Sequence, residues 1–188
     1  GEQIEPYLVF SSSHDGSAAI KVAMTPVRVV CQNTLNIALS SAKRMWSTVH
    51  VGDLAHKMDD AHNTLLLAEK YMGKLGAEFS RLSKIKLTDA KVMEYIDMLL
   101  PMNDNPTDIH KKNIIRIRED MKLRYFDAPD LKGCVGKNAY RFICAVSDFA
   151  THSQPLRETA SYRENVFAKT VEGNPLIDKA YELIQAVA

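Results

Sequence analysis

Hydrophobic and polar residues near the amino end alternate in the way that β-strands require. Residues 7–10 are aromatic and β-branched, and residues 19–24 alternate apolar with small or polar side chains. Between them, Asp15 and Gly16 form a dipeptide that is a strong signal for a tight hairpin turn. The pattern predicts an antiparallel β-hairpin.

A helix and a further strand are expected next. Thr25 followed by Pro26 is typical of a helix start, with threonine as N-cap and proline at the first helical position. Apolar residues from Val27 onwards then recur at helical spacing. Residues 44–51 return to an alternating pattern, with Trp46 on one side of the predicted strand.

The most regular pattern in the chain is a heptad seam. It predicts one helix over residues 53–83, about 45 Å long at a rise of about 1.5 Å per residue. Such a helix packs across its own domain or, through the seam, against a second copy of the chain. The seam consists of Leu54, Met58, Ala61, Leu65, Ala68, Met72, Leu75, Phe79 and Leu82.

The remaining patterns are helical, interrupted by proline and glycine. Helices are expected over residues 88–100, 108–125, 135–152, 158–169 and 176–187. The predicted fold is therefore a single α+β domain over residues 1–188. A small antiparallel sheet (hairpin, helix, strand) occupies residues 1–52 and a mainly helical part occupies residues 53–188. Because the chain begins with Gly1, we expect it to be a fragment of a longer protein.

Composition narrows the class of protein without naming a function. The 188 residues are 46% hydrophobic and 25% charged, as in globular domains, and the net charge of +1 provides no global attraction for nucleic acid. No apolar run approaches the roughly 20 residues of a membrane span. Three cysteines without a paired spacing favour reduced thiols and a cytoplasmic location.

Three blocks of sequence resemble a known family. They are Thr-Pro-Val-Arg-Val-Val-Cys-Gln-Asn-Thr-Leu at 25–35, a second block from Asn138 to His152, and Gly-Asn-Pro-Leu-Ile-Asp-Lys-Ala at 173–180. Together they resemble the phage/plasmid-like family known as domain of unknown function 932. The resemblance implies a gene carried by phages, prophages and plasmids. It implies no agreed activity and no catalytic residues.

The candidate chemical sites are few. His56 and Asp60, four residues apart on one helix face, are weak candidates for a metal site that would need two further ligands. Asp148 and His152 have the same spacing, which suits an acid–base dyad and equally a structural hydrogen bond. The glycine-rich stretch 133–138 departs from the phosphate-loop pattern, so no cofactor is expected.

A basic stripe is the candidate for contact with nucleic acid. Lys111, Arg118 and Lys122 line one flank of the helix predicted over 108–125 and could meet phosphates, or could simply form a solvated face. Arg28 and Arg44 would extend this surface if the fold brings them close. Trp46 is the candidate platform for stacking of bases.

Three classes of function follow from these observations, the third and weakest being a hydrolytic enzyme with a metal at His56 and Asp60. The first is a non-enzymatic protein that associates with single-stranded or duplex DNA in replication, recombination or maintenance of a mobile element. The second is a protein-interaction or anti-defence module that assembles through the helix over residues 54–82. Its homo-oligomer contacts would be Leu54, Met58, Leu65, Met72, Leu75 and Phe79. No reaction is identified, so we expect a protein that is not an enzyme.

Overall fold

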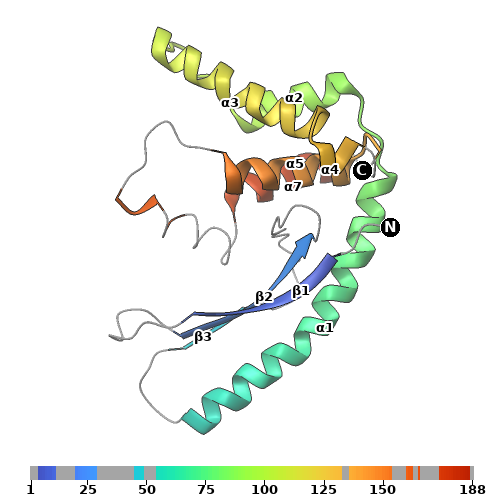
Figure 1. Cartoon of the computed structure of the whole chain (residues 1–188), viewed down its shortest axis with the longest axis vertical. Coiled ribbons are helices and arrows are strands. Elements are labelled where there is room, and N and C mark those ends of the chain that lie inside the picture. Colours follow the sequence, from blue (N-terminus) through green and yellow to red (C-terminus); the bar gives the residue numbers. More distant parts are fainter. Residues whose placement is uncertain are drawn as a thin grey trace.

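The computed structural model places a group of helices at one end of a single long helix (Figure 1). It describes residues 4–11, 20–28, 45–48, 54–132, 136–153, 160–162, 165 and 174–186. The principal helices are α1 (Leu54–Lys84), α2 (Asp89–Leu99), α3 (Asp108–Phe126), α4 (Pro129–Lys132), α5 (Ala139–His152) and α7 (Pro175–Gln185). The long helix and the helices at α2, α3 and α7 are confirmed with ends that differ by one or two residues. The predicted helix over 158–169 lies almost wholly outside the described residues.

Four of these helices begin at a polar side chain that accepts a hydrogen bond from the first helical turn. Thr88 accepts from the backbone N–H of Lys91, and Thr107 accepts from that of His110. Asn138 and Asn174 cap α5 and α7 in the same way. Each cap satisfies a backbone donor that otherwise has no partner inside the helix, which explains why such sequence-local signals place the starts of α2, α3 and α7 well. The predicted start of α5 at residue 135 is wrong, since the helix begins at Ala139, directly after its Asn138 cap.

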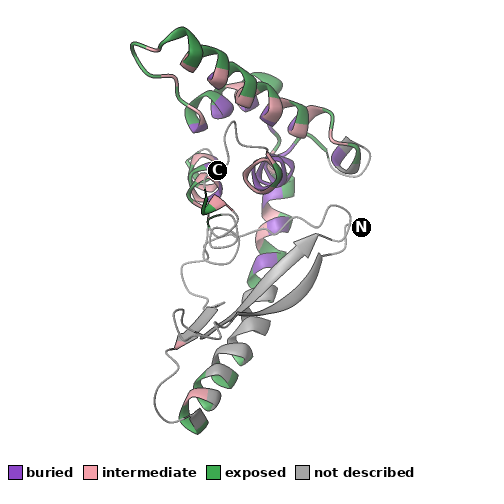
Figure 2. Cartoon of the chain, turned by 60° about the vertical axis from the view of Figure 1, so that its left-hand side comes forward, coloured by how far each residue is buried: buried purple, intermediate pink, exposed green. Residues whose placement is uncertain are grey.

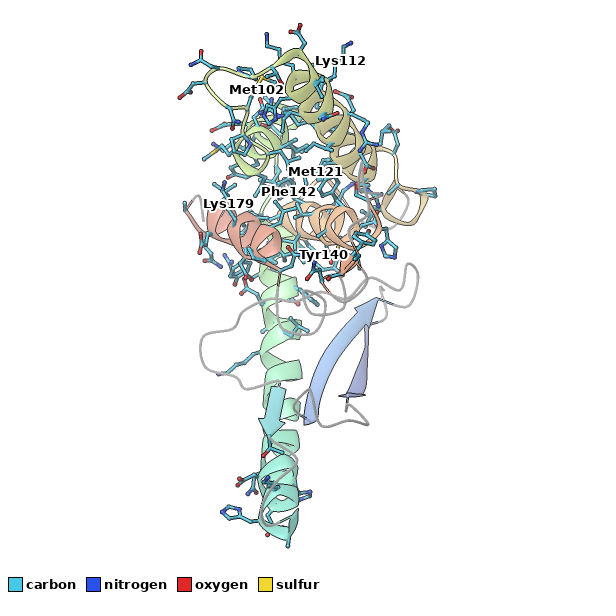
Figure 3. The ribbon with its side chains drawn as sticks, turned by 90° about the vertical axis from the view of Figure 1, so that its left-hand side faces the viewer. Met102, Lys112, Met121, Tyr140, Phe142 and Lys179 are labelled. Atoms are coloured by element: carbon cyan, nitrogen blue, oxygen red, sulfur yellow. The ribbon has the colours of Figure 1, made fainter. Side chains whose placement is uncertain are left out.

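Helix α5 forms the centre of the core. All nine residues from Ala139 to Ser147 are buried, and the helix packs against α1, α3 and α7 (Figures 1 and 2). Phe142 is completely buried between two tyrosines, with ring centroids 5.6 Å from Tyr95 of α2 and 6.2 Å from Tyr125 of α3. Figure 3 shows Phe142 and Met121 between the two layers of helices. The hydrophobic contacts of one helix thus hold three others in place.

The second half of α1 belongs to this core. Leu75, Phe79 and Leu82 are buried, and Phe79 lies with its ring centroid 5.1 Å from that of Tyr140. Leu75 and Phe79, expected in a seam against a second copy, therefore pack within their own chain. The side chains of Leu54, Met58, Leu65 and Met72 are outside the described residues.

Three strands lie beside α1: β1 (Ile4–Ser11), β2 (Ile20–Arg28) and β3 (Met45–Thr48), antiparallel in the order β1-β2-β3 (Figure 1). Apart from Thr48, no side chain in them is described. Every buried core residue that the structure describes lies on a helix or in a turn between helices. The predicted α+β class is therefore wrong for the described core, which is helical, because its apolar helix faces bury one another.

The predicted helix start at Thr25 and Pro26 is also wrong, since both residues lie in β2, and the part of that predicted helix after Arg28 lies outside the described residues. Pro26 faces Pro6 in register, so the two residues without a backbone donor stand opposite one another. In addition, β3 pairs only with residues 20–23 of β2, so no third strand reaches Pro26. An edge position of this kind tolerates proline, and the strand continues to Arg28.

Polar contacts join α7 to α1 through a single carboxylate. Glu78 accepts hydrogen bonds from Arg81 Nη2 at 2.6 Å and from Tyr181 Oη at 2.6 Å, and its side chain is 14% exposed. The hydrogen bonds from Arg81 outweigh the effect of burial and, together with that of Tyr181, hold the pKa of Glu78 below its ordinary value of 4.5. Burial and the contact with Glu78 raise the pKa of Tyr181.

The position of Phe142 predicts a large loss of stability on truncation. We expect Phe142→Ala to lower the free energy of unfolding by about 3–5 kcal/mol, because removing the ring leaves a cavity between α2, α3 and α5. Urea denaturation measures the change. Leu123→Ala, at a side chain that is 58% exposed, is the matched control and should cost less than about 0.5 kcal/mol. Equal costs for the two variants would contradict the central position of α5.

Glu78 predicts a specific dependence of stability on pH. Because its folded-state pKa is lowered, its contribution is fully present above about pH 4.5 and is lost as pH falls through the folded pKa. In Glu78→Gln, we expect the free energy of unfolding to fall less steeply between about pH 5 and pH 3 than in the original chain. Urea denaturation at several pH values tests this, with Glu94→Gln, at an exposed residue of α2, as the control. Identical pH profiles for Glu78→Gln and the original chain would refute it.

Candidate functional site

Arg118 of the predicted basic stripe is a structural residue. Its Nε donates to the carbonyl oxygen of Leu100 at 2.9 Å, and its Nη1 lies 2.9 Å from Asp97 Oδ1. These contacts satisfy a carbonyl at the carboxyl end of α2, where the helix dipole also favours a cation. The side chain is only 19% exposed. Arg118 therefore joins α3 to α2 and has little surface left for a phosphate.

The other two residues of the stripe differ from one another. Lys122 Nζ lies 2.5 Å from Glu119 Oε1, and its side chain is 23% exposed. Lys111 is half exposed, and its Nζ lies 3.9 Å from Asp108 Oδ1, at the limit of an ion pair. The predicted stripe is thus not a row of available charges, and only Lys111 presents its charge to solvent.

Two cations on α3 that the stripe did not include are more available. Lys112 and Arg116 are exposed, and neither forms an ion pair with any residue that the structure describes. Glu119 and Asp120, the acids within reach of Arg116 along the helix, bond to Lys122 and Arg124 instead. In Figure 3 the side chain of Lys112 points away from the core. The sequence could have indicated the availability of Arg116, because Glu119 and Asp120 each also have a second basic residue three or four positions further along the helix. Spacing among the basic residues alone does not show this.

Large apolar side chains are exposed on the same part of α3. Ile109 is 74% exposed and Ile115 is 54% exposed. We refer to Ile109, Lys111, Lys112, Ile115 and Arg116 together as the outer face of α3. It covers the first two turns of the helix, which extend beyond the packed helices (Figure 1). An exposed surface that combines cations with apolar groups suits an amphiphilic anionic partner.

For the remaining nucleic-acid candidates, the structure describes at most the backbone. Arg28 ends β2 and Trp46 lies in β3, with side chains that are not described, and Arg44 is outside the described residues. The strands lie alongside α1, whereas α3 lies on the other side of α5 and α7 (Figures 1 and 3).

The weak metal candidates form an exposed pair. His56 Nδ1 lies 3.7 Å from Asp60 Oδ2, with side chains that are 75% and 55% exposed. Within the described ranges, no cluster of three histidine, cysteine or acidic side chains is arranged to hold a metal ion. The pair has the geometry of an ordinary surface contact between neighbouring helical turns.

The Asp148–His152 pair belongs to an ionic network between α3 and α5. His152 Nδ1 lies 3.2 Å from Asp148 Oδ1, and Asp148 Oδ2 accepts a 2.5 Å hydrogen bond from Arg124. Arg124 also bonds to Asp120, which accepts from the Ser153 hydroxyl at 2.6 Å. Burial lowers the pKa of Arg124, but Asp148 and Asp120 outweigh it and hold that pKa above its ordinary value. These contacts fix the end of α5 against α3, which is a structural role.

In the glycine-rich stretch before α5, Lys137 also forms its contacts within the protein. Lys137 Nζ lies 2.8 Å and 2.7 Å from the two carboxylate oxygens of Asp89. The backbone of Lys137 and Ala139 also bonds to the segment between α1 and α2. Residues 133–135 are outside the described part. Lys137 thus connects α5 to α2 and is not positioned as a phosphate-loop lysine.

The structural role of Arg118 predicts a stability effect on replacement. We expect Arg118→Ala to lower the free energy of unfolding by about 1–2 kcal/mol, because the carbonyl of Leu100 and the carboxylate of Asp97 lose a charged donor. Arg116→Ala, two residues away on the exposed side, is the matched control and should change it by less than about 0.5 kcal/mol. Thermal and urea unfolding give both values. If the two variants were equally stable, Arg118 would not be a helix-capping residue.

Comparisons with known proteins identify a family and add no named relative. No helix in the described ranges is both long and apolar enough to cross a membrane. Neither the curated proteins nor the solved structures contain a significant match to this chain. A family model does match, over residues 1–171, which is most of the chain. The chain therefore belongs to the family described as a domain of unknown function (DUF932).

Proposed function

We propose that this chain is a non-enzymatic module that binds the phosphate backbone of nucleic acid through the outer face of α3. The observation that carries the proposal is the exposure of Lys112 and Arg116 without a carboxylate partner among the described residues. Other cations of α3 are engaged within the protein, Arg118 with α2 and Arg124 with α5. Cations that no internal contact neutralises can bind phosphates, and this binding releases the counterions that are condensed on the nucleic acid.

The position of these cations on α3 supports the same proposal. Lys112 and Arg116 are four residues apart, so their side chains are neighbours on one surface of the helix. Lys111, the residue before Lys112, lies further round the helix and is half exposed. The first turns of α3 also carry the positive end of the helix dipole, although Asp108, 94% exposed, offsets part of it. Three cations predict modest, salt-sensitive binding.

The biological setting of the proposal comes from the family resemblance. We propose a role in replication, recombination or maintenance of a phage or plasmid, in a reducing cytoplasm. Cys144 is buried in the core as a thiol, which is compatible with such a compartment.

A second candidate function is a protein-interaction module that assembles through α1. The first half of α1 extends past the packed helices (Figure 1), and Leu66 is 57% exposed on it. Sedimentation of the chain over a range of concentrations tests this candidate. Self-association that Leu66→Ser abolishes would support it, and a monomer at all concentrations would exclude a homo-oligomer.

The proposal predicts how salt affects DNA binding. In Lys112→Ala/Arg116→Ala, we expect affinity for labelled DNA to fall by about tenfold or more at low salt. The slope of log affinity against log salt concentration should fall by about 1.4 to 1.8, because two phosphate contacts are lost. Fluorescence anisotropy at several salt concentrations measures both quantities.

The matched control for this experiment removes the same charge elsewhere. Lys84→Ala/Lys86→Ala changes two exposed lysines near the end of α1 and should leave affinity and slope nearly unchanged. Equal effects of the two double variants, or no binding of DNA at low salt, would refute the proposal.

A further inference from the structure

The chemistry of the outer face of α3 goes beyond phosphate binding. Ile109, Lys112 and Ile115 follow one another at intervals of three residues, so an exposed cation lies between two exposed isoleucines. Successive members are separated by about 4.5 Å of helical rise, and side chains three apart are surface neighbours. Arg116 adjoins Ile115. Apolar and cationic groups therefore alternate along one strip of the helix.

The exposure of the isoleucines calls for an apolar partner. In the described part of the chain, five large hydrophobic side chains are exposed, and three of them, Ile109, Ile115 and Leu123, are on α3. The buried side of α3 consists of other residues, namely Ile114, Met121 and Tyr125. Packing within the described core therefore does not account for Ile109 and Ile115.

We infer that the outer face of α3 binds single-stranded nucleic acid in preference to duplex. This inference rests on the proposed function and specifies its ligand. A single strand presents phosphates and unstacked base faces along the same chain, so it contacts cations and apolar side chains together. In a duplex the base faces are stacked inside the helix, and phosphates and groove edges are what remains exposed.

The small number of cations on this face also favours a single strand over a duplex as its ligand. Only three cations are available there, and Asp108 lies among them with a side chain that is 94% exposed. Counterion release from about three phosphates gives limited affinity, so a ligand without accessible base faces is held weakly. Burial of Ile109 and Ile115 against bases adds a contribution that does not depend on salt.

The guanidinium of Arg116 suits this ligand in a second way. A planar guanidinium can stack on an exposed base while its positive charge remains near a phosphate. Because Arg116 has no ion pair with a described residue, neither contact requires an internal bond to break. Arg118 and Arg124, by contrast, would each have to give up a carboxylate.

The test separates apolar from ionic contributions to binding. Fluorescence anisotropy with a labelled thymidine homo-oligonucleotide and a labelled duplex of the same length compares the original chain with Ile109→Ser/Ile115→Ser. We expect the double variant to bind the single strand about tenfold or more weakly, with an unchanged salt slope because no charge is removed. Binding of the duplex should change little. Met98→Ser, at an exposed apolar residue of α2, is the control and should leave both affinities as they are.

Other results would overturn the inference, and they are distinguishable from failure of the proposed function. Equal affinity for the two probes, together with a loss of binding in Lys112→Ala/Arg116→Ala, would retain nucleic-acid binding and reject the preference for single strands. Absence of binding to both probes would reject both proposals. Self-association of the original chain that Ile109→Ser/Ile115→Ser abolishes, with oligonucleotide binding unchanged, would assign this face to a second copy and overturn the inference. Circular dichroism confirms that each variant is folded.

Discussion

The burial of α5 is the constraint on which the described structure depends. A run of nine buried residues has no polar face to present to water, so the helix is stable only when other helices surround it. Helices α1, α3 and α7 meet this requirement directly, and α2 reaches the same core through the ring of Tyr95. Arg141 shows how strict the requirement is. It is the buried cation of α5, and it donates to the carbonyl oxygens of Tyr125, Phe126 and Leu131. A polar group enters this core only with several acceptors around it.

The charged residues of α3 divide according to the same constraint. Where α3 packs on α2 and α5, its arginines bond to carboxylates and carbonyls, and they stabilise the contact between helices. Where the helix extends beyond its neighbours, Lys112 and Arg116 have no such partners among the described residues. The candidate binding surface is thus defined by where packing ends, which is a property of the tertiary structure.

This division explains which features the sequence could predict. The starts of α2 and α3 follow from Thr88 and Thr107, because a cap acts within one helical turn. The buried half of the heptad seam follows from its spacing, since Leu75, Phe79 and Leu82 share one helix face. The internal role of Arg118 could not be predicted, because its partners Leu100 and Asp97 lie about twenty residues away in the sequence and meet it only in the folded chain. The partner of Lys122, by contrast, is Glu119 of the same helix, at a spacing of three that the sequence does show. Thr25 and Pro26 were misread because a helix start and a strand segment that is paired on one side accept the same two residues, and only the pairing with Pro6 distinguishes them. Alternation in sequence located three strands, but it could not show that the described core is built from helices alone.

The ends of the helices carry a further consequence, for the order in which the domain folds. The last carbonyls of α2 are satisfied by Arg118 of α3 and by Lys179 of α7, which donates to Met98 at 2.7 Å. Those of α3 are satisfied by Arg141 of α5. Each helix is therefore completed by a residue that comes later in the chain. During synthesis, α2 and α3 emerge with unsatisfied carboxyl ends, and short helices in that condition are only marginally stable in water. The described core has all of these contacts only once α7 has docked, so we expect the helical core to form late in synthesis.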